Sequence, residues 1–414
     1  MPTLDPLVQP AALHAFAGFG IELEYMIVDR QDLTVRPLAD ILLRDAQGEI
    51  VNELERARLA WSNELVLHVV ELKTNGPAES LAGLAELFHA DVLEINRRLA
   101  EQDACLLPTA MHPLFDPDRE TRLWPHGQNE IYAAYDRIFG CRGHGWSNLQ
   151  SMHINLPFHD DQEFRRLHAA IRVVLPLIPA LAASSPLEQG RRASWLNNRL
   201  RYYRDNQRSI PQISGGVIPE AVSGIADYHQ RILEPMYRAI AAHDPENILA
   251  DDWLNSRAAI ARFERQTIEI RIIDLQECPR ADLAVAEAVA ALVQAFYEER
   301  WASFEDQQAM DTASLGAQLW LAAEQGGAAA CAEPAYLRVL GLAGPLPCRA
   351  VWQELLGRLT LTANARRTLE QMLARGTLAE AIVERLGTQP HRRRIVECYR
   401  EIGQCLIENR LFAS

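Results

Sequence analysis

Apolar and polar residues alternate in three separated stretches of the chain, namely residues 19–28, 149–158 and 266–274. Successive side chains of a β-strand point to opposite faces, so each stretch predicts a strand with one aliphatic face. The opposite face carries acids, a histidine and an arginine: Glu22, Glu24, His153, Glu269 and Arg271. Strands that share this division indicate one sheet with an apolar face and a chemical face.

A fourth strand is predicted over residues 64–73, which are rich in Val and Leu and end at an Asn-Gly-Pro turn. Its acids, Glu64 and Glu71, are seven residues apart in the sequence. In one regular strand they would point to opposite faces. Either a bulge or a turn intervenes, or one of them does not reach the chemical face.

Helical patterns fill much of the remaining chain. Apolar residues recur at spacings of three and four from about residue 79 to 103, and further helices are expected up to about residue 183 and from about 281 to 304. Beyond these the chain is rich in Ala and Leu. The sequence predicts an α/β (α+β) protein in which residues 306–414 form a helical extension packed on a main domain of residues 1–305.

Composition narrows the class of protein. The chain has 414 residues, with 41 Lys and Arg against 55 Asp and Glu, a net charge of −14. This balance argues against a nucleic-acid or membrane-surface binder, because such proteins need a positive face. Seven scattered cysteines without a CxxC pair suggest reduced thiols, and no signal peptide or membrane span is recognisable. We expect a soluble, cytoplasmic protein.

The carboxylates of the chemical face require an explanation, since charged groups are costly to bury unless they are paired or bound to cations. Arg271 alone cannot form ion pairs with all five carboxylates: Glu22, Glu24, Glu64, Glu71 and Glu269. Hard oxygen ligands favour Mg²⁺ or Mn²⁺, which in turn favour phosphates as further ligands. The chain has no P-loop, no GxGxxG after a strand, no HExxH and no GxSxG.

Each of these residues also has a simpler explanation. Glu22 and Glu24 could lie on a solvated strand face, and His153 could be an ordinary hydrogen-bonded histidine. Glu269 and Arg271 could form a structural ion pair. The Arg-dense residues 185–201 could be a solvated surface or a clamp for a carboxylate.

Taken together, five segments in this order resemble the glutamate-cysteine ligase superfamily, in particular the branch that includes the bacterial carboxylate-amine ligases. The resemblance covers roughly residues 18 to 300. The segments are Gly20-Ile21-Glu22-Leu23-Glu24, Glu64 with Glu71-Leu72-Lys73-Thr74, Met152-His153-Ile154-Asn155, Ser184-Ser185-Pro186 with Gly190 and Arg199, and Ile268-Glu269-Ile270-Arg271 with Asp274.

The resemblance implies a glutamine-synthetase-like fold, a curved and mainly antiparallel sheet whose concave face holds ATP, Mg²⁺ (or Mn²⁺) and an amino acid. It implies that metal is held by Glu22, Glu24, Glu64, Glu71, His153 and Glu269. Arg271 would stabilise the transferred phosphoryl group. Arg199 is our choice for the α-carboxylate of glutamate, with Arg137 as a weaker second and Arg201 as a competitor.

The implied reaction is ATP-dependent formation of γ-glutamylcysteine through an acyl phosphate, a step of glutathione biosynthesis. Family members commonly show H-x-H-x-G where this chain has His153 to Pro157, and an aromatic residue where it has Leu187. The amine therefore stays open, and a carboxylate-amine ligase with another amine is the alternative. A non-catalytic nucleotide or amino-acid sensor and a metal-dependent hydrolase are further candidates. A homo-oligomer is compatible with the sequence.

Overall fold

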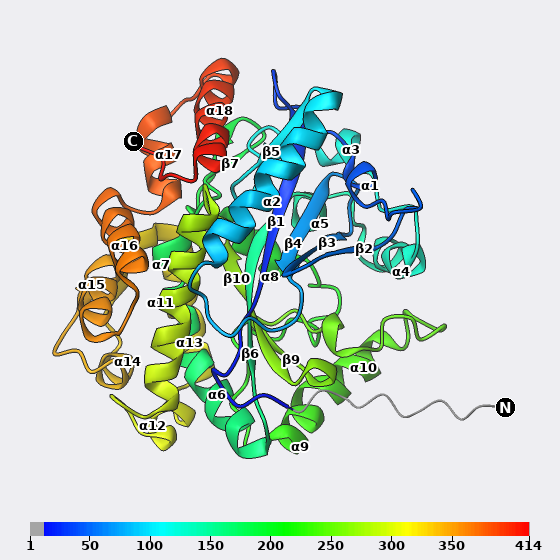
Figure 1. The fold of residues 1–414 in the computed structure, drawn as a ribbon. Helices are drawn as coiled ribbons and strands as arrows, with labels where there is room; N and C mark the ends of the chain where they lie inside the picture. The colour runs from blue at the N-terminus through cyan, green and yellow to red at the C-terminus, as the bar shows by residue number, and fades with distance from the viewer. Residues whose placement is uncertain (1–11, 414) are drawn as a thin grey trace.

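The computed structural model describes residues 12–413, and a sheet of eight strands lies at its centre (Figure 1). The strand order is β2-β3-β4-β1-β6-β10-β9, with β5 also paired to β1, and every pair is antiparallel. The predicted mixed fold with a mainly antiparallel sheet is confirmed. The strands are β1 Gly20–Asp29, β2 Glu53–Arg56, β3 Leu59–Asn63, β4 Val69–Thr74, β5 Ala104–Leu107, β6 Ser151–Pro157, β9 Ala259–Arg262 and β10 Thr267–Asp274.

Helices cover the aliphatic face of this sheet. Strand residues such as Ile21, Leu23 and Ile154 share one buried core with the apolar stripes of α2 (Leu84–Leu99), α6 (Asp161–Val174) and α11 (Pro279–Tyr297). Figure 1 shows α2 and α11 side by side over the sheet. Burial of this face, at about 25 cal/mol per Å² of apolar surface, is the main driving force for the layer arrangement.

Shorter helices and strands complete the chain. Those before α11 are α1 Ala39–Leu42, α3 Pro117–Glu120, α4 Asn129–Phe139, α5 His144–Ser147, α7 Pro179–Ala182, α8 Asn198–Asp205, α9 Ile225–Tyr228 and α10 Glu234–Ile240, with the hairpin β7 Leu187–Glu188 and β8 Arg191–Arg192. Those after it are α12 Phe304–Gln308, α13 Thr312–Gln325, α14 Pro334–Val339, α15 Cys348–Arg358, α16 Ala363–Arg375, α17 Leu378–Leu386 and α18 Arg392–Glu408, with β11 Ala330–Cys331 and β12 Leu346–Pro347. None of the described helices is both long and apolar enough to cross a membrane.

The prediction of one strand over residues 64–73 is wrong. β3 ends at Asn63 and β4 begins at Val69, and a turn closed by the bond from Val69 N to Val66 O separates them. The intervening residues pair elsewhere, since Leu67 N donates to Arg122 O and Trp124 N donates to Leu65 O. The turn is the alternative that allows Glu64 and Glu71 to approach the same side.

The helix expected to run to residue 183 is interrupted. It ends at Val174, gives way to a 3₁₀ turn at Leu175–Leu177, and resumes as the short helix α7. Pro176 and Pro179 fall at these junctions, where their missing N–H groups cannot continue the helical hydrogen bonds.

The helical C-terminal region contacts the rest of the protein through buried polar bonds as well as apolar packing. Tyr336 Oη donates to Val173 O (2.7 Å) and Trp352 Nε1 donates to Leu177 O (2.8 Å). Arg375 pairs with the buried carboxylate of Glu277 and donates to Phe412 O (2.9 Å). We propose that residues 306–414 are an extension that folds as one unit with residues 1–305.

The Arg375–Glu277 pair provides a test of this proposal. Arg375→Met should lower the free energy of unfolding by about 3 kcal/mol, because it leaves the Glu277 carboxylate buried without its partner. Arg367→Met, on an exposed position of the same helix, should change it by less than about 0.5 kcal/mol. Urea unfolding followed by circular dichroism measures both. A separate early transition of the C-terminal helices in the unaltered protein would contradict the proposal.

Candidate active site

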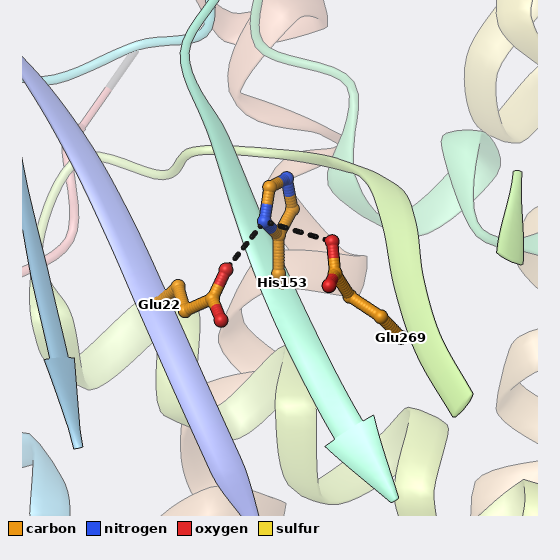
Figure 2. Close-up of side chains that lie close together, drawn as sticks. All are labelled: Glu22, His153 and Glu269. Atoms are coloured by element: carbon orange, nitrogen blue, oxygen red, sulfur yellow. Dashed lines mark hydrogen bonds and ion pairs between the residues drawn. The ribbon is translucent and has the colours of Figure 1, made fainter. Parts of the chain in front are cut away.

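Three neighbouring strands bring an acid, a histidine and a second acid together on the chemical face (Figure 2). Glu22 of β1 lies directly opposite His153 of β6, and Glu269 of β10 lies opposite Asn155. His153 Nδ1 is 2.7 Å from Glu22 Oε2 and 3.7 Å from Glu269 Oε1. Possible ligand atoms of the three residues all lie within 4.8 Å of one another. Directly opposed residues of an antiparallel pair share a face, so the register itself assembles this group.

His153 also belongs to a second group, with Glu24 and Glu71, whose possible ligand atoms lie within 4.8 Å of one another. Glu24 of β1 is opposite Glu71 of β4. Glu24 accepts from the backbone N (2.7 Å) and the hydroxyl (3.1 Å) of Ser151. Glu71 accepts from the Ser62 hydroxyl and lies 3.4 Å from Lys73 Nζ. We call these residues, from both groups, the acidic cluster: Glu22, Glu24, Glu71, His153 and Glu269.

Glu64 lies beside the acidic cluster but in neither group of possible ligands. Its carboxylate makes no hydrogen bond or ion pair with the residues that the structure describes. Burial raises the pKa of Glu64 well above its ordinary value, and the charges of Glu24 and Glu71 raise it further. Of the predicted metal ligands, Glu64 is therefore the one that the fold brings near the cluster without placing it in a ligand group.

The charges of the acidic cluster are unevenly compensated. Burial works against the ionised form of Glu22, but the hydrogen bond and charge of His153 outweigh it and hold the pKa of Glu22 well below the ordinary value. Burial disfavours protonated His153, yet the bond to Glu22 and the neighbouring glutamates raise its pKa to about 9. Burial and the charge of Glu22 raise the pKa of Glu71 to about 7, despite Lys73. On the side that contains Glu64 and Glu71, Lys73 therefore does not fully offset the negative charge.

This donor set fits a hard divalent cation. It offers carboxylate oxygens and one imidazole, which suit Mg²⁺ or Mn²⁺. A cation between Glu24, Glu71 and His153 would supply the charge that the raised pKa values of Glu64 and Glu71 show to be missing. His153 must lose a proton to act as a ligand, so metal and proton compete for the cluster.

Arg271 pairs with Glu269, with Nε 2.9 Å from Glu269 Oε1. The structural ion pair considered from the sequence is therefore formed in this structure. Arg271 is not the sole partner, however, because Arg262 Nη1 also donates to Glu269 Oε2 (2.9 Å). Arg271 lines a cavity, and its side chain is 24% exposed. Arg262 is not among the residues that line this cavity. Glu269 keeps a cation partner if Arg271 turns to a ligand.

Residues of the acidic cluster line two cavities. The smaller, of about 150 Å³, contains Glu24, Glu64, His153 and Arg271 and has a wall of aromatic rings from Tyr135, Trp146, Tyr203 and Trp253. The larger, of about 560 Å³, contains Glu22, Lys73 and Arg265 and has apolar walls from Leu13, Phe19, Pro77, Pro157 and Phe263. Glu22 lines the larger cavity and His153 the smaller, and their hydrogen bond brings the two linings into direct contact.

The remaining predicted arginines differ in position. Arg199 lines the smaller cavity but is only 2% exposed; its Nε donates to Asp274 Oδ1 (2.6 Å) and its Nη2 to Arg271 O (3.3 Å). Arg201 pairs with Glu188 (2.7 Å) and lies outside this cavity. Arg137 is exposed, donates to His243 O (2.8 Å) and is not brought to the cluster. Of the five N–H donors of Arg199, those on Nη1 and the second one on Nη2 are left for a ligand.

Sequence reasoning missed the aromatic wall of the smaller cavity and most of the larger cavity. Tyr135 is two residues from Arg137, a candidate for substrate binding, but nothing in the local pattern distinguishes a ring that lines a cavity from a core ring. Lys73 and Asp274 belong to the motifs, but the sequence predicts no role for either of them. Asp274 holds Arg199, and Lys73 lies between Glu53 (2.7 Å) and Glu71 (3.4 Å).

Comparisons with known proteins agree with this picture. Residues 18–393 match the model of glutamate-cysteine ligase family 2 (GCS2). An uncharacterised protein of Archaeoglobus fulgidus is 37% identical over 281 residues, which is 68% of this chain and 75% of that protein. A protein of Ruegeria pomeroyi, provisionally named glutamate–cysteine ligase 2, is 24% identical and is covered to 85%, against 87% of this chain.

Among solved structures, glutamate–cysteine ligase from Francisella tularensis in complex with AMP has a TM-score of 0.62 at 12% identity, covering 94% of this chain and 88% of that one. At this identity the likeness establishes the fold. The family match over residues 18–393 carries the conclusion: the chain belongs to glutamate-cysteine ligase family 2 and is an ATP-dependent ligase.

Proposed function

We propose that the protein joins the γ-carboxylate of glutamate to an amine at the expense of ATP, with cysteine as the first candidate for the amine. The observation that carries the proposal is that one acidic cluster lines two cavities of different character. A ligase of this class must place a nucleotide and a carboxylate on either side of the transferred phosphoryl group. The arrangement supports this reaction type.

The larger cavity suits the nucleotide. Its apolar walls, including Phe19, Pro77 and Phe263, can enclose a planar base. Lys73 and Arg265 supply positive charge on the side where Glu22 joins the cluster. The triphosphate would then extend toward the acidic cluster, where bound Mg²⁺ or Mn²⁺ would neutralise its charge.

The smaller cavity suits the amino acid. Its volume of about 150 Å³ accommodates a small amino acid rather than a nucleotide, and Arg271 is its most available cation. Arg199, held by Asp274, would support the floor of the cavity and could offer Nη1 to a carboxylate. With substrates bound, the aromatic wall would limit the access of water to the reacting groups.

The proposed reaction needs no nucleophile from the protein. A γ-carboxylate oxygen attacks the γ-phosphorus of ATP, and the bond from that phosphorus to the bridging oxygen breaks to release ADP. The amine nitrogen then attacks the acyl carbon, loses a proton and expels phosphate. Arg271 would stabilise the charge on the phosphoryl group during the first step, since Glu269 retains Arg262 as a partner.

Cytoplasmic location is part of the proposal, because ATP is available there and all seven cysteines are free thiols in the structure. With cysteine as the amine, the product is γ-glutamylcysteine and the reaction belongs to glutathione biosynthesis. The decisive experiment supplies ATP, glutamate and each of the common amino acids in turn, and records ADP release together with product mass. Product formation without ATP would favour a hydrolase, and nucleotide binding without any turnover would favour a sensor.

Replacing Glu24 tests the acidic cluster. Glu24→Gln should lower turnover by about a hundredfold, because it removes a metal ligand while it keeps the shape of the side chain. The melting temperature should hold or rise slightly, since repulsion with Glu64 and Glu71 is relieved. Glu55→Gln on the exposed face of β2 is the matched control and should leave both quantities unchanged. Normal turnover of Glu24→Gln at limiting Mg²⁺ would exclude this residue from the metal site.

Arginine-to-lysine exchanges separate catalysis from structure around Glu269. Arg271→Lys keeps the charge but loses the planar fork, so kcat should fall by about a hundredfold with little change in melting temperature. Arg262→Lys, at the other arginine that pairs with Glu269, should instead lower stability and largely preserve kcat. If Arg271→Lys melts early and turns over normally, the phosphoryl-transfer role of Arg271 is refuted.

The titration of the cluster predicts how pH affects the metal-free protein. Folding raises the pKa of Glu71 from 4.5 to about 7 and that of His153 from 6.5 to about 9, so the folded state binds more protons than the unfolded state. Stability in EDTA should therefore fall as pH rises from about 5 to about 9. Glu22 acts in the opposite direction and only at acidic pH, because its pKa is lowered.

Saturating Mg²⁺ should flatten this decline, and its affinity should increase with pH as the competing protons leave. Chemical denaturation at several pH values, with EDTA and with Mg²⁺, measures both effects. Glu71→Gln should reduce the slope between pH 4.5 and about 7 without abolishing it, because the raised pKa of Glu64 also contributes in this range. An identical pH profile with and without Mg²⁺ would contradict metal binding at the cluster.

A further inference from the structure

The first described segment of the chain forms part of the larger cavity. Ala12, Leu13 and Gly18 line it together with the start of β1. Gly18 is buried, and a Cβ atom there would lie 2.8 Å from Leu13 Cδ1 and 3.0 Å from Pro77 Cβ. Residues 12–18 therefore fit closely between the body of the protein and the turn that contains Pro77, and we call them the N-terminal wall.

The N-terminal wall is held from outside the cavity by Glu163 of α6. Glu163 Oε2 accepts from Ala15 N (2.8 Å) and from His159 N (2.9 Å). Its Oε1 lies 2.8 Å from His14 Nδ1, which must donate because the ionised carboxylate is an acceptor only. Figure 1 shows the start of the chain running beside α6. One carboxylate thus joins the wall to the helix layer.

Two further contacts fix the same segment. The Phe16 ring packs edge-on against Tyr297 of α11, with centroids 5.4 Å apart. The His14 and His159 rings lie 4.3 Å apart, and His159 Nδ1 is 3.1 Å from Ala12 O. The segment is attached at both ends of its turn, and Leu13, between the attachments, reaches the cavity.

A role for Glu163 in capping α6 does not account for these bonds. The N-cap of α6 is Asp160, whose side chain already accepts from Glu163 N (2.9 Å). Two of the three contacts of the Glu163 carboxylate go to His14 and Ala15 rather than to the helix. Most contacts of the Glu163 carboxylate are therefore made with the N-terminal wall.

We propose that Glu163 is a positioning residue for nucleotide binding, which acts by holding the N-terminal wall as a preformed side of the larger cavity. The inference rests on the proposed function in one respect, that the larger cavity receives the nucleotide. A wall that is ordered before binding spares the ligand the cost of ordering it, so its attachment contributes to affinity although Glu163 touches no ligand.

The test compares substitutions that remove the attachment with ones that keep it. Glu163→Ala should raise the Kd of Mg·ADP, measured by calorimetry, by about tenfold, because the wall is no longer preformed. Glu163→Gln should restore affinity to within about twofold, since its amide oxygen can accept from both backbone N–H groups and its NH₂ can donate to neutral His14. Gln162→Ala, at an exposed position in the same turn of α6, is the matched control.

Phe16→Ala detaches the same wall from the opposite side and should also weaken Mg·ADP binding, so the inference does not depend on one variant. In Glu163→Ala, kcat and the KM for glutamate should stay unchanged, and hydrogen exchange should increase at residues 12–18. A purely structural role of Glu163 predicts a lower melting temperature with unchanged Kd for Mg·ADP.

Wild-type affinity in both Glu163→Ala and Phe16→Ala would overturn this inference and leave the proposed function intact. Failure of the unaltered protein to bind Mg·ADP at all would refute the proposed function, and the positioning role with it. The two failures are distinguished by the unaltered protein alone.

Discussion

The mutual repulsion of buried carboxylates is the constraint on which the rest of this structure depends. Glu22, Glu24, Glu71 and Glu269 lie on one face of a sheet, each less than 10% exposed. Such a group can persist in a folded protein only if cations, protons or donors offset its charge. The structure uses all three: Arg262 and Arg271 at Glu269, a protonated His153 at Glu22, and Ser151 at Glu24.

The compensation is complete on one side of the cluster and incomplete on the other. Glu269 has two arginines, whereas Glu64 has no partner among the described residues and Glu71 has only Lys73 and Ser62. The raised pKa values of Glu64 and Glu71 express this deficit. A protein built only for stability would avoid such a site, so the deficit is the physical argument for a bound cation, and functional sites are where such costs are retained.

The surrounding fold makes the cluster usable. Helices α2, α6 and α11 bury the aliphatic face, which leaves the chemical face free for ligands. The cluster then divides the space above it into a larger cavity with apolar walls and a smaller one with aromatic rings and Arg271. Segments far apart in the chain close these cavities, including residues 12–18 and the turn at Phe263–Arg265.

The sequence by itself determined which residues share the chemical face. Alternation places Glu22 and Glu24 together and Glu269 with Arg271, because side-chain direction in a strand is a local property of period two. The family resemblance carried by these strands also followed from the sequence. The face of Glu64 relative to Glu71 did not, because residues 65–67 pair with a segment more than fifty residues away, and local pattern carries no information about that pairing.

Only the tertiary structure decided which side chain each residue of the chemical face contacts. The register that sets Glu24 opposite Glu71 and Glu22 opposite His153 depends on strand order, which long-range pairing fixes. The sequence predicts that Arg199 binds a substrate carboxylate, but in the structure its Nε donates to Asp274, which is 75 residues away in the chain. The charge state of His153 likewise depends on three glutamates from two other strands. Pairing, burial and electrostatics are properties of residues brought together through space, whereas the sequence pattern specifies only what each strand can present.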